Sequence, residues 1–152
     1  MNVAPGSDGK WILLVEDNAY DEALTLRAFR KSGLESYVVV ARDGVEALDY
    51  LLRTGQHADR GPGGTPRVIL LDLRLPRLDG LEVLRQLRAD ERTSLLPEVI
   101  LTSSDENKDI AECYRLGSNS YVCKPVSFTQ FAEAVRNVSL YWLMFNQVPS
   151  RL

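Results

Sequence analysis

The sequence predicts an α/β fold, a doubly wound parallel sheet of five strands with helices on both faces. Short apolar runs alternate along the chain with longer segments whose apolar residues recur at helical spacing. The short runs are hydrophobic at successive positions, as in strands that a parallel sheet buries on both sides. At 152 residues the chain is long enough to bury one continuous core, so we expect a single domain.

The first two units each pair a strand with a helix. Residues 11–15 are apolar throughout, and the helix that follows over residues 19–32 stops at Gly33. The second strand, residues 36–41, is rich in β-branched valine, and the helix over residues 43–52 begins with an aspartate that serves as its N-cap. The strand-helix alternation therefore repeats from the start of the chain.

Three more units follow a long, turn-rich connection. We expect their strands over residues 68–71, 98–102 and 121–123, and their helices over residues 81–87, 105–116 and 127–147. Short right-handed crossovers then require a parallel sheet, most simply in the flavodoxin-like strand order 2-1-3-4-5. Residues 1–10 are expected to form a flexible N-terminal segment, and residues 11–152 one domain with an extended final helix and a C-terminal tail.

Composition argues against several classes of protein. The net charge is −3 and no Lys/Arg cluster stands out, so neither nucleic acid nor a membrane is expected as a partner. The N-terminus lacks the apolar segment of a signal peptide and no stretch has the length of a membrane span, which predicts a cytoplasmic protein. Cys113 and Cys123 are expected to be reduced structural thiols, and with His57 as the single histidine a zinc site or histidine-based triad lacks ligands.

Polar side chains stand where four of the predicted strands end. Glu16 and Asp17 follow the first strand, Asp72 follows the third, Thr102 ends the fourth and Lys124 follows the fifth. Each has an ordinary explanation by itself, such as a solvated loop acid, a helix cap or a surface ion pair. The carboxyl ends of parallel strands meet at one edge of a sheet, where open α/β folds bind their ligands, so we expect these side chains to form one site.

Three carboxylates at one edge predict a bound Mg²⁺, because they repel one another unless a hard cation lies among them. We expect Asp17 and Asp72 to ligate the metal directly together with the backbone carbonyl of Arg74, while Glu16 holds a coordinated water. Lys124 and the Thr102 hydroxyl are suited to phosphoryl oxygens. The set fits a phosphoaspartate formed at Asp72.

Four motifs, LLVEDN, VILLDLRLPRLDGLEVL, VILTSS and SYVCKP, resemble the successive motifs of the receiver domain of two-component response regulators over residues 11–138. The resemblance implies that Asp72 accepts a phosphoryl group from a histidine kinase. It makes Glu16 and Asp17 the acidic pair, and it makes Thr102 the switch hydroxyl, Tyr121 the switch aromatic and Lys124 the lysine of the site. The resemblance also implies a cis peptide bond between Lys124 and Pro125.

The long loop after the second helix, the phrase LTSS and the ending YWLMFNQVP resemble the single-domain regulators paired with bacterial phytochromes. Arg74 departs from that subfamily, which more often has asparagine there, and its guanidinium could pair with Glu16 or with the phosphoryl group. We expect no output domain and no separate enzymatic activity. Signalling would then proceed by a conformational switch that governs binding or dimerisation, or by phosphorelay.

Three other functions fit parts of the pattern. A Mg²⁺-dependent phosphatase with an aspartate nucleophile would need a second acid two residues after Asp72, where Arg74 stands. A flavin-binding module shares the fold but needs a phosphate loop after the first strand, and the segment EDNAYDE is acidic. A receiver-like scaffold that is never phosphorylated would not need the acids, Thr102 and Lys124 together.

The final helix carries more apolar residues than the sheet requires. One stripe at helical spacing comprises Phe128, Phe131, Val135, Val138, Trp142 and Phe145. Outside that stripe lie Tyr141, Leu143, Met144 and Val148. We therefore expect a homodimer through the fourth helix, the fifth strand, the fifth helix and its extension. Its expected interface residues are Tyr141, Trp142, Met144 and Phe145. The alternatives are that the extension folds back on its own domain or binds the kinase.

Overall fold

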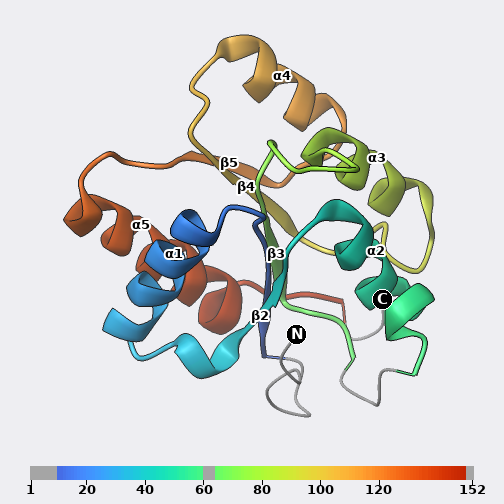
Figure 1. Ribbon diagram of the computed structural model, residues 1–152, viewed down its shortest axis with the longest axis horizontal. Coiled ribbons are helices and arrows are strands. Elements are labelled where there is room, and N and C mark those ends of the chain that lie inside the picture. Colours follow the sequence, from blue (N-terminus) through green and yellow to red (C-terminus); the bar gives the residue numbers. More distant parts are fainter. Residues whose placement is uncertain (1–9, 60–63, 150–152) are drawn as a thin grey trace.

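A parallel sheet of five strands lies at the centre of the molecule, described here from a computed structural model over residues 10–59 and 64–149 (Figure 1). The strands are β1 (Ile12–Val15), β2 (Val38–Ala41), β3 (Val68–Leu71), β4 (Glu98–Thr102) and β5 (Ser120–Cys123). Their order in the sheet, β2-β1-β3-β4-β5, confirms the predicted order. In the register of β1, Ile12 stands opposite Val38 on one side and Val68 on the other.

The strands are connected by the helices α1 (Ala19–Lys31), α2 (Gly44–Leu52), α3 (Gly80–Ala89) and α4 (Asn107–Arg115), and α5 (Phe128–Leu140) follows β5. Four of these helices begin at a residue whose side chain accepts a hydrogen bond from a backbone N–H in the first turn; these N-caps are Asn18, Asp43, Asp79 and Ser127. The predicted cap at Asp43 is thereby confirmed.

The helices bury two separate apolar layers, one on each face of the sheet. Alternate residues of β1 point to opposite faces, so Leu13 packs with α2, α3 and α4, whereas Ile12 packs with α1 and α5. Figure 1 shows α1 and α5 together on one side of the sheet and α2 and α3 on the other. All four residues of β1 and all four of β3 are buried, which explains their continuous hydrophobicity.

The second strand is shorter than predicted. Residues Ser36 and Tyr37 belong to a 3-10 turn, η1 (Glu35–Tyr37), in which the Tyr37 N–H donates to the Leu34 carbonyl at 3.0 Å. Pairing with β1 begins only at Val38, the partner of Ile12. The valine-rich run predicts the strand, but the strand begins at Val38 because that residue is the first to pair with β1.

The final helix changes its geometry at Tyr141, which overturns part of the predicted stripe. After α5 the chain forms a π-helical turn, η3 (Tyr141–Phe145), closed by a bond of 2.7 Å from the Asn146 N–H to the Tyr141 carbonyl. The wider turn rotates the residues that follow it. Leu143, expected outside the stripe, is therefore buried, and Phe145, expected to cover the sheet, is 71% exposed.

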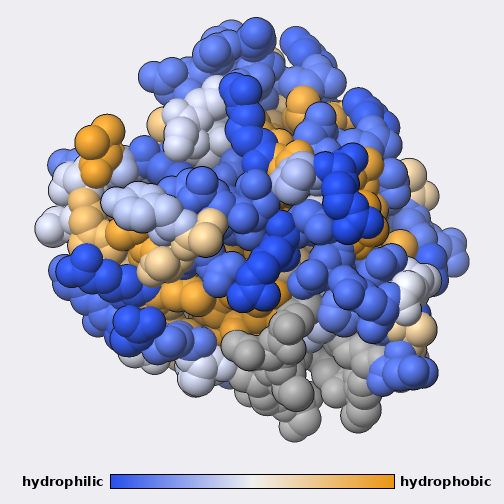
Figure 2. Space-filling view, in the orientation of Figure 1, coloured by the Kyte–Doolittle hydropathy of each residue, from blue (hydrophilic) through white to orange (hydrophobic). Residues whose placement is uncertain are grey.

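Residues 1–9, 60–63 and 150–152 lie outside the described part of the chain, so the expected flexible N-terminal segment and the end of the expected tail are not covered. No helix in the described ranges is long and apolar enough to cross a membrane. On the face shown in Figure 2, hydrophilic side chains predominate and hydrophobic surface is confined to patches between them.

A buried contact between a carboxyl group and a guanidinium lies at the amino edge of the sheet. Glu98, the first residue of β4, is fully buried, and its carboxylate lies 3.1 Å from Nη1 of Arg88. That nitrogen donates to the carbonyls of Ser94 and Leu96, so neither oxygen of Glu98 has a hydrogen-bond partner. Burial raises the pKa of Glu98 to about 8, against the opposing charge of Arg88. The folded state therefore favours the protonated carboxyl.

We expect the stability of Glu98→Gln to fall less than that of the wild type as the pH rises. Because folding raises the pKa of Glu98 from 4.5 to about 8, this group stabilises the protein most below the lower value, and that contribution is lost as the pH rises through the higher one. From about pH 5 to about pH 7.5, the free energy of unfolding of the variant minus that of the wild type should increase by roughly 3 kcal/mol. Urea unfolding at several pH values measures both free energies. A difference between them that does not change with pH would contradict the raised pKa of Glu98.

Candidate functional site

A cavity of about 530 Å³ opens at the carboxyl edge of the sheet. The loops after β1, β3 and β4 line it, and five residues predicted for the site are among its lining: Glu16, Asp17, Asp72, Arg74 and Thr102. Lys124 reaches the same carboxylates from the end of β5. The topology thus brings together the polar residues that follow four different strands, as predicted.

Asp72 lies at the floor of this cavity and is almost completely buried. Its Oδ1 accepts hydrogen bonds from the Thr102 hydroxyl (3.2 Å) and from the Arg74 N–H (3.1 Å). Its Oδ2 accepts a bond of 3.1 Å from Nζ of Lys124. The carboxylate is therefore held in one orientation by three donors, which come from its own loop, from the end of β4 and from the residue after β5.

The close passage of the β3–α3 loop over the start of α3 fixes the backbone at Asp72. Gly80, the first residue of α3, donates its N–H to the Leu73 carbonyl at 2.9 Å. A Cβ at this position would collide with the Asp72 carbonyl and the Leu73 Cα. Only glycine allows this approach, so Gly80 helps to position the carboxylate without contacting it.

Lys124 is the counterion of the site. Its Nζ donates to Oε1 of Glu16 at 2.8 Å and lies 3.7 Å from a carboxylate oxygen of Asp21. Burial raises the pKa of Glu16 to about 7, although the bond to Lys124 acts in the opposite direction. Burial alone would lower the pKa of Lys124, but the bond to Glu16 and the charge of Asp72 outweigh it and raise the pKa.

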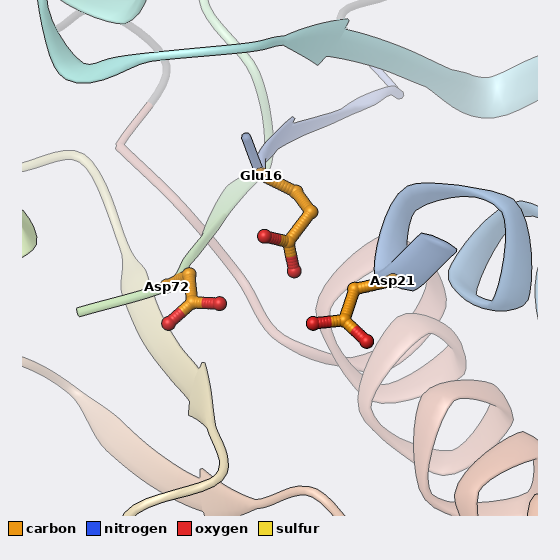
Figure 3. Close-up of side chains that lie close together, drawn as sticks. All are labelled: Glu16, Asp21 and Asp72. Carbon is orange, nitrogen blue, oxygen red and sulfur yellow. The ribbon is translucent and has the colours of Figure 1, made fainter. Parts of the chain in front are cut away.

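Three carboxylates converge on the cavity: Glu16 from the end of β1, Asp72 from the end of β3 and Asp21 from the first turn of α1 (Figure 3). Each offers an oxygen within 4.8 Å of the others. One lysine cannot neutralise three carboxylates, and oxygen donors of this kind are those that Mg²⁺ and related hard cations prefer. The residues present therefore fit a divalent cation.

The acidic cluster differs from the predicted one in its third member. Asp17, expected to ligate the metal directly, is exposed and lies outside the cluster, although it lines the cavity. Sequence reasoning missed Asp21, whose N–H is bound by the side chain of the N-cap Asn18 at 2.9 Å. The N-cap spacing Asn-x-x-Asp places Asp21 in the first helical turn and could have revealed it.

Arg74 contributes its backbone to the site, and its side chain makes no ion pair with any described residue. Glu16, which a guanidinium at this position could have paired with, is bound by Lys124 instead. The Arg74 side chain is exposed at the mouth of the cavity, where it is free to meet a bound group.

Tyr121 connects β5 with the loop that follows β4. Its hydroxyl donates to the Ser104 carbonyl at 2.8 Å, and its ring packs against the apolar layer beneath α2, α3 and α4. Burial raises the pKa of this phenol. The tyrosine expected to act as the switch aromatic is therefore bonded to the loop that begins after Thr102.

The predicted cis bond between Lys124 and Pro125 is wrong, because no peptide bond in the described part of the chain is cis. Trans is the more stable form of X–Pro bonds by about 0.5–1 kcal/mol. The backbone at this point is held by a bond of 2.7 Å from the Lys124 N–H to the Thr102 carbonyl. With this bond made and the peptide trans, Lys124 already reaches both carboxylates.

Comparison with known proteins assigns the family. The family model described as the response regulator receiver domain matches residues 12–136. The chain belongs to the response regulator receiver family. Phosphorylation of an aspartate is typical of such receivers, and they bind Mg²⁺ or Mn²⁺ at an acidic site.

Three relatives of this receiver illustrate the match. A probable methanogenesis regulatory protein, FilR2 of Methanothrix harundinacea, is 42% identical over 97% of this chain and 93% of its own length. The bacteriophytochrome response regulator AtBRR is 48% identical, with a TM-score of 0.72 over 97% of this chain and 100% of that one. The phosphorylated cyanobacterial phytochrome response regulator RcpA is 37% identical, with a TM-score of 0.82 over 91% and 97%.

We expect Asp21→Asn to weaken the affinity of the receiver for Mg²⁺ and Mn²⁺ by ~10-fold, because it removes one of three convergent carboxylates. Titration calorimetry with each metal measures the change. Glu22→Gln is the matched control, since Glu22 is the next residue of α1 but pairs with Arg42 outside the cluster. If Asp21→Asn keeps the wild-type affinity and Asp17→Asn loses it, Asp17 is the metal ligand, as the sequence predicts.

Proposed function

We propose that this receiver accepts a phosphoryl group on Asp72 from a histidine kinase. The observation that carries the proposal is the placement of Asp72, a carboxylate on the floor of a polar cavity with Lys124, Thr102 and two further acids around it. Aspartate phosphorylation is typical of the family. Two relatives are named as phytochrome response regulators, which supports a bacterial phytochrome as the kinase. We also propose that the receiver is cytoplasmic.

In the proposed transfer, an oxygen of Asp72 attacks the phosphorus of a phosphohistidine. The new O–P bond forms as the P–N bond breaks, and the departing imidazole keeps the electron pair and takes up a proton. Phosphoryl transfer depends mainly on alignment and neutralisation of charge. Thr102 and Lys124 already contact the Asp72 carboxylate, so both lie within reach of the group that it would carry.

A divalent cation held by Asp72, by the neighbouring acids Glu16, Asp17 and Asp21 and by the Arg74 carbonyl, our proposed additional ligand, would neutralise phosphoryl oxygens. We propose Mg²⁺ as this cation. The protein's own part is to align the carboxylate through the Arg74 N–H and the Thr102 hydroxyl. Loss of its own phosphoryl group by hydrolysis would then be its only further reaction.

The phosphatase reading is weaker than the receiver reading. An aspartate-nucleophile phosphatase needs a general acid near the leaving group, and the residue two positions after Asp72 is Arg74, whose side chain carries no proton to give at neutral pH. An unphosphorylated scaffold would have no use for a cavity that concentrates three carboxylates around one lysine. We therefore retain the phosphoryl acceptor.

We expect Mg²⁺-dependent phosphorylation confined to Asp72. Incubation with acetyl phosphate and Mg²⁺, followed by intact-protein mass spectrometry, should show one added phosphoryl group in the wild type and none in Asp72→Asn. Asp105→Asn, another acid of the cavity lining, is the matched control and should be modified like the wild type. A phosphoryl mass on Asp72→Asn would exclude Asp72 as the acceptor.

We expect Arg74→Asn to shorten the phosphoryl lifetime by about 3-fold while leaving phosphorylation intact. The exposed guanidinium lies at the cavity mouth, where an ion pair with the phosphoryl group would stabilise it by a modest amount. Dephosphorylation rates measured after removal of the phosphodonor test this. Arg77→Asn in the same loop is the control, because Arg77 pairs with Asp43 and its positive φ of 66° suits asparagine. Equal dephosphorylation rates in all three proteins would show that the Arg74 side chain does not stabilise the phosphoryl group.

We further propose that the receiver forms a homodimer through α4, β5, α5 and η3. The support is apolar exposure on η3: Tyr141, Met144 and Phe145 are 51%, 63% and 71% exposed. Trp142 packs partly against the core and meets Tyr141 edge to face at 5.2 Å. Aromatic side chains and methionine are enriched at the cores of interfaces, so this surface suits a second copy of the chain.

Met144→Ala combined with Phe145→Ala should weaken the dimer by at least ~10-fold, because both side chains are exposed apolar anchors. Sedimentation velocity over a range of protein concentrations, with and without acetyl phosphate and Mg²⁺, measures the association. Leu95→Ala removes an exposed apolar residue from the α3–β4 connection and should leave association unchanged. A wild type that remains monomeric at high concentration in both states would exclude the homodimer.

A further inference from the structure

The guanidinium of Arg88, in the last turn of α3, binds two connecting segments at the amino edge of the sheet. Its Nη1 donates to the carbonyls of Ser94 and Leu96 in the α3–β4 connection, at 3.0 and 2.8 Å. Its Nε donates to the Gly117 carbonyl at 2.9 Å and its Nη2 to Oδ1 of Asn119 at 3.0 Å, both in the α4–β5 connection. Both protons of Nη1 are therefore already bound to backbone carbonyls.

The carboxyl group of Glu98 is buried beside that same nitrogen. Because successive residues of a strand point to opposite faces, Glu98 shares its face with Ile100 and enters the apolar layer beneath α3 and α4, and its partner in β3 is the apolar Ile69. One of its oxygens lies 3.1 Å from Nη1 of Arg88, and neither oxygen has a hydrogen-bond partner among the described residues. A buried carboxyl without a donor is costly, and Arg88 is within reach to become one.

Arg88 on α3 is the charged group that acts on Glu98 within the described part of the chain. The α4–β5 connection presents the neutral amide of Asn119. Cys113 of α4 and Tyr121 of β5 border the same apolar layer, and burial raises the pKa of both, that of the thiol to about 11, so neither is charged where Glu98 titrates. Burial raises the pKa of Glu98 to about 8 against the charge of Arg88. The carboxyl is therefore protonated at neutral pH and ionised in mildly alkaline solution.

We propose that Glu98 and Arg88 form a pH-sensitive switch that controls the α3–β4 connection, residues 90–97. When Glu98 releases its proton to the solvent, the carboxylate takes an N–H of Nη1 from the carbonyl of Ser94 or Leu96. Two opposite charges in a buried site attract one another more strongly than a charge attracts a carbonyl dipole, so the ion pair is favoured. The connection loses a hydrogen bond to α3, and it is released as the pH rises.

The release is confined to the segment around Leu95. Earlier in the connection, the Thr93 hydroxyl donates to the Leu87 carbonyl at 2.7 Å, a buried bond in which the guanidinium takes no part. On the other side, the Asn119 N–H donates to the Glu98 carbonyl and its Oδ1 accepts from the Glu98 N–H, so the α4–β5 connection stays paired with β4. Leu95 is an exposed apolar residue, so the surface at this edge of the molecule changes with pH.

Carbon-detected NMR of the wild type tests the switch, because carboxyl and carbonyl carbons are observed at alkaline pH without any amide proton. Over about three pH units centred on the pKa, the side-chain carboxyl carbon of Glu98 should titrate with a midpoint of about 8. The carbonyl carbon of Ser94 or of Leu96, or both, should shift with the same midpoint. The carbonyl carbon of Gly117, which is bonded by Nε, should not shift.

Glu98→Gln keeps the shape of the side chain but cannot ionise, so in this variant the carbonyls of Ser94 and Leu96 should no longer respond to pH. Glu82→Gln is the matched control, because Glu82 also contacts α3 arginine chemistry but pairs with Arg85 at the surface, and it should leave the response as in the wild type. A Glu98 carboxyl that titrates while both carbonyls stay fixed would overturn the switch, as would a carboxyl that does not titrate in this range. A carbonyl response that persists in Glu98→Gln would assign the movement to another group and overturn it too.

Discussion

The ammonium group of Lys124 holds the carboxyl edge of the sheet together. It bonds Glu16 at the end of β1 and Asp72 at the end of β3, and it reaches Asp21 on α1. Carboxylates this close would repel one another in the folded chain without a cation among them. The packing of the first, third and fifth strands at this edge therefore depends on one charge.

The charge of Lys124 still leaves the site with a net negative charge, and this imbalance accounts for the chemistry expected there. The pKa of Glu16 is raised to about 7 by burial even though it has the shortest contact with Lys124. Such a site gains stability from any further positive charge, so the imbalance favours a bound divalent cation, and that cation would also offset the negative charge of a phosphoryl group. The close approach at Gly80 and the cap at Asn18 keep the acids in place despite their repulsion.

Sequence reasoning located the residues whose position depends on the sheet. Asp72, Thr102 and Lys124 each follow or end a strand, and parallel topology brings strand ends together regardless of side-chain detail. Asp21 was missed because its place depends on the rotation of a helix after its cap. Leu143 and Phe145 were misplaced for a related reason, since a π turn alters the helical period that assigns residues to a face. Local geometry of this kind leaves little trace in a pattern of apolar residues.

The ion pair between Glu16, which follows β1, and Lys124, which follows β5, has a consequence for synthesis on the ribosome. Glu16 and Lys124 are separated by 108 positions, and α1 packs against α5. A nascent chain that lacks β5 and α5 has its acids without their lysine and leaves Phe29 and Ile12 uncovered on one face of the sheet. Contacts this distant in sequence form late. The receiver can therefore complete its fold only after α5 has emerged, and until then the exposed apolar face is open to aggregation.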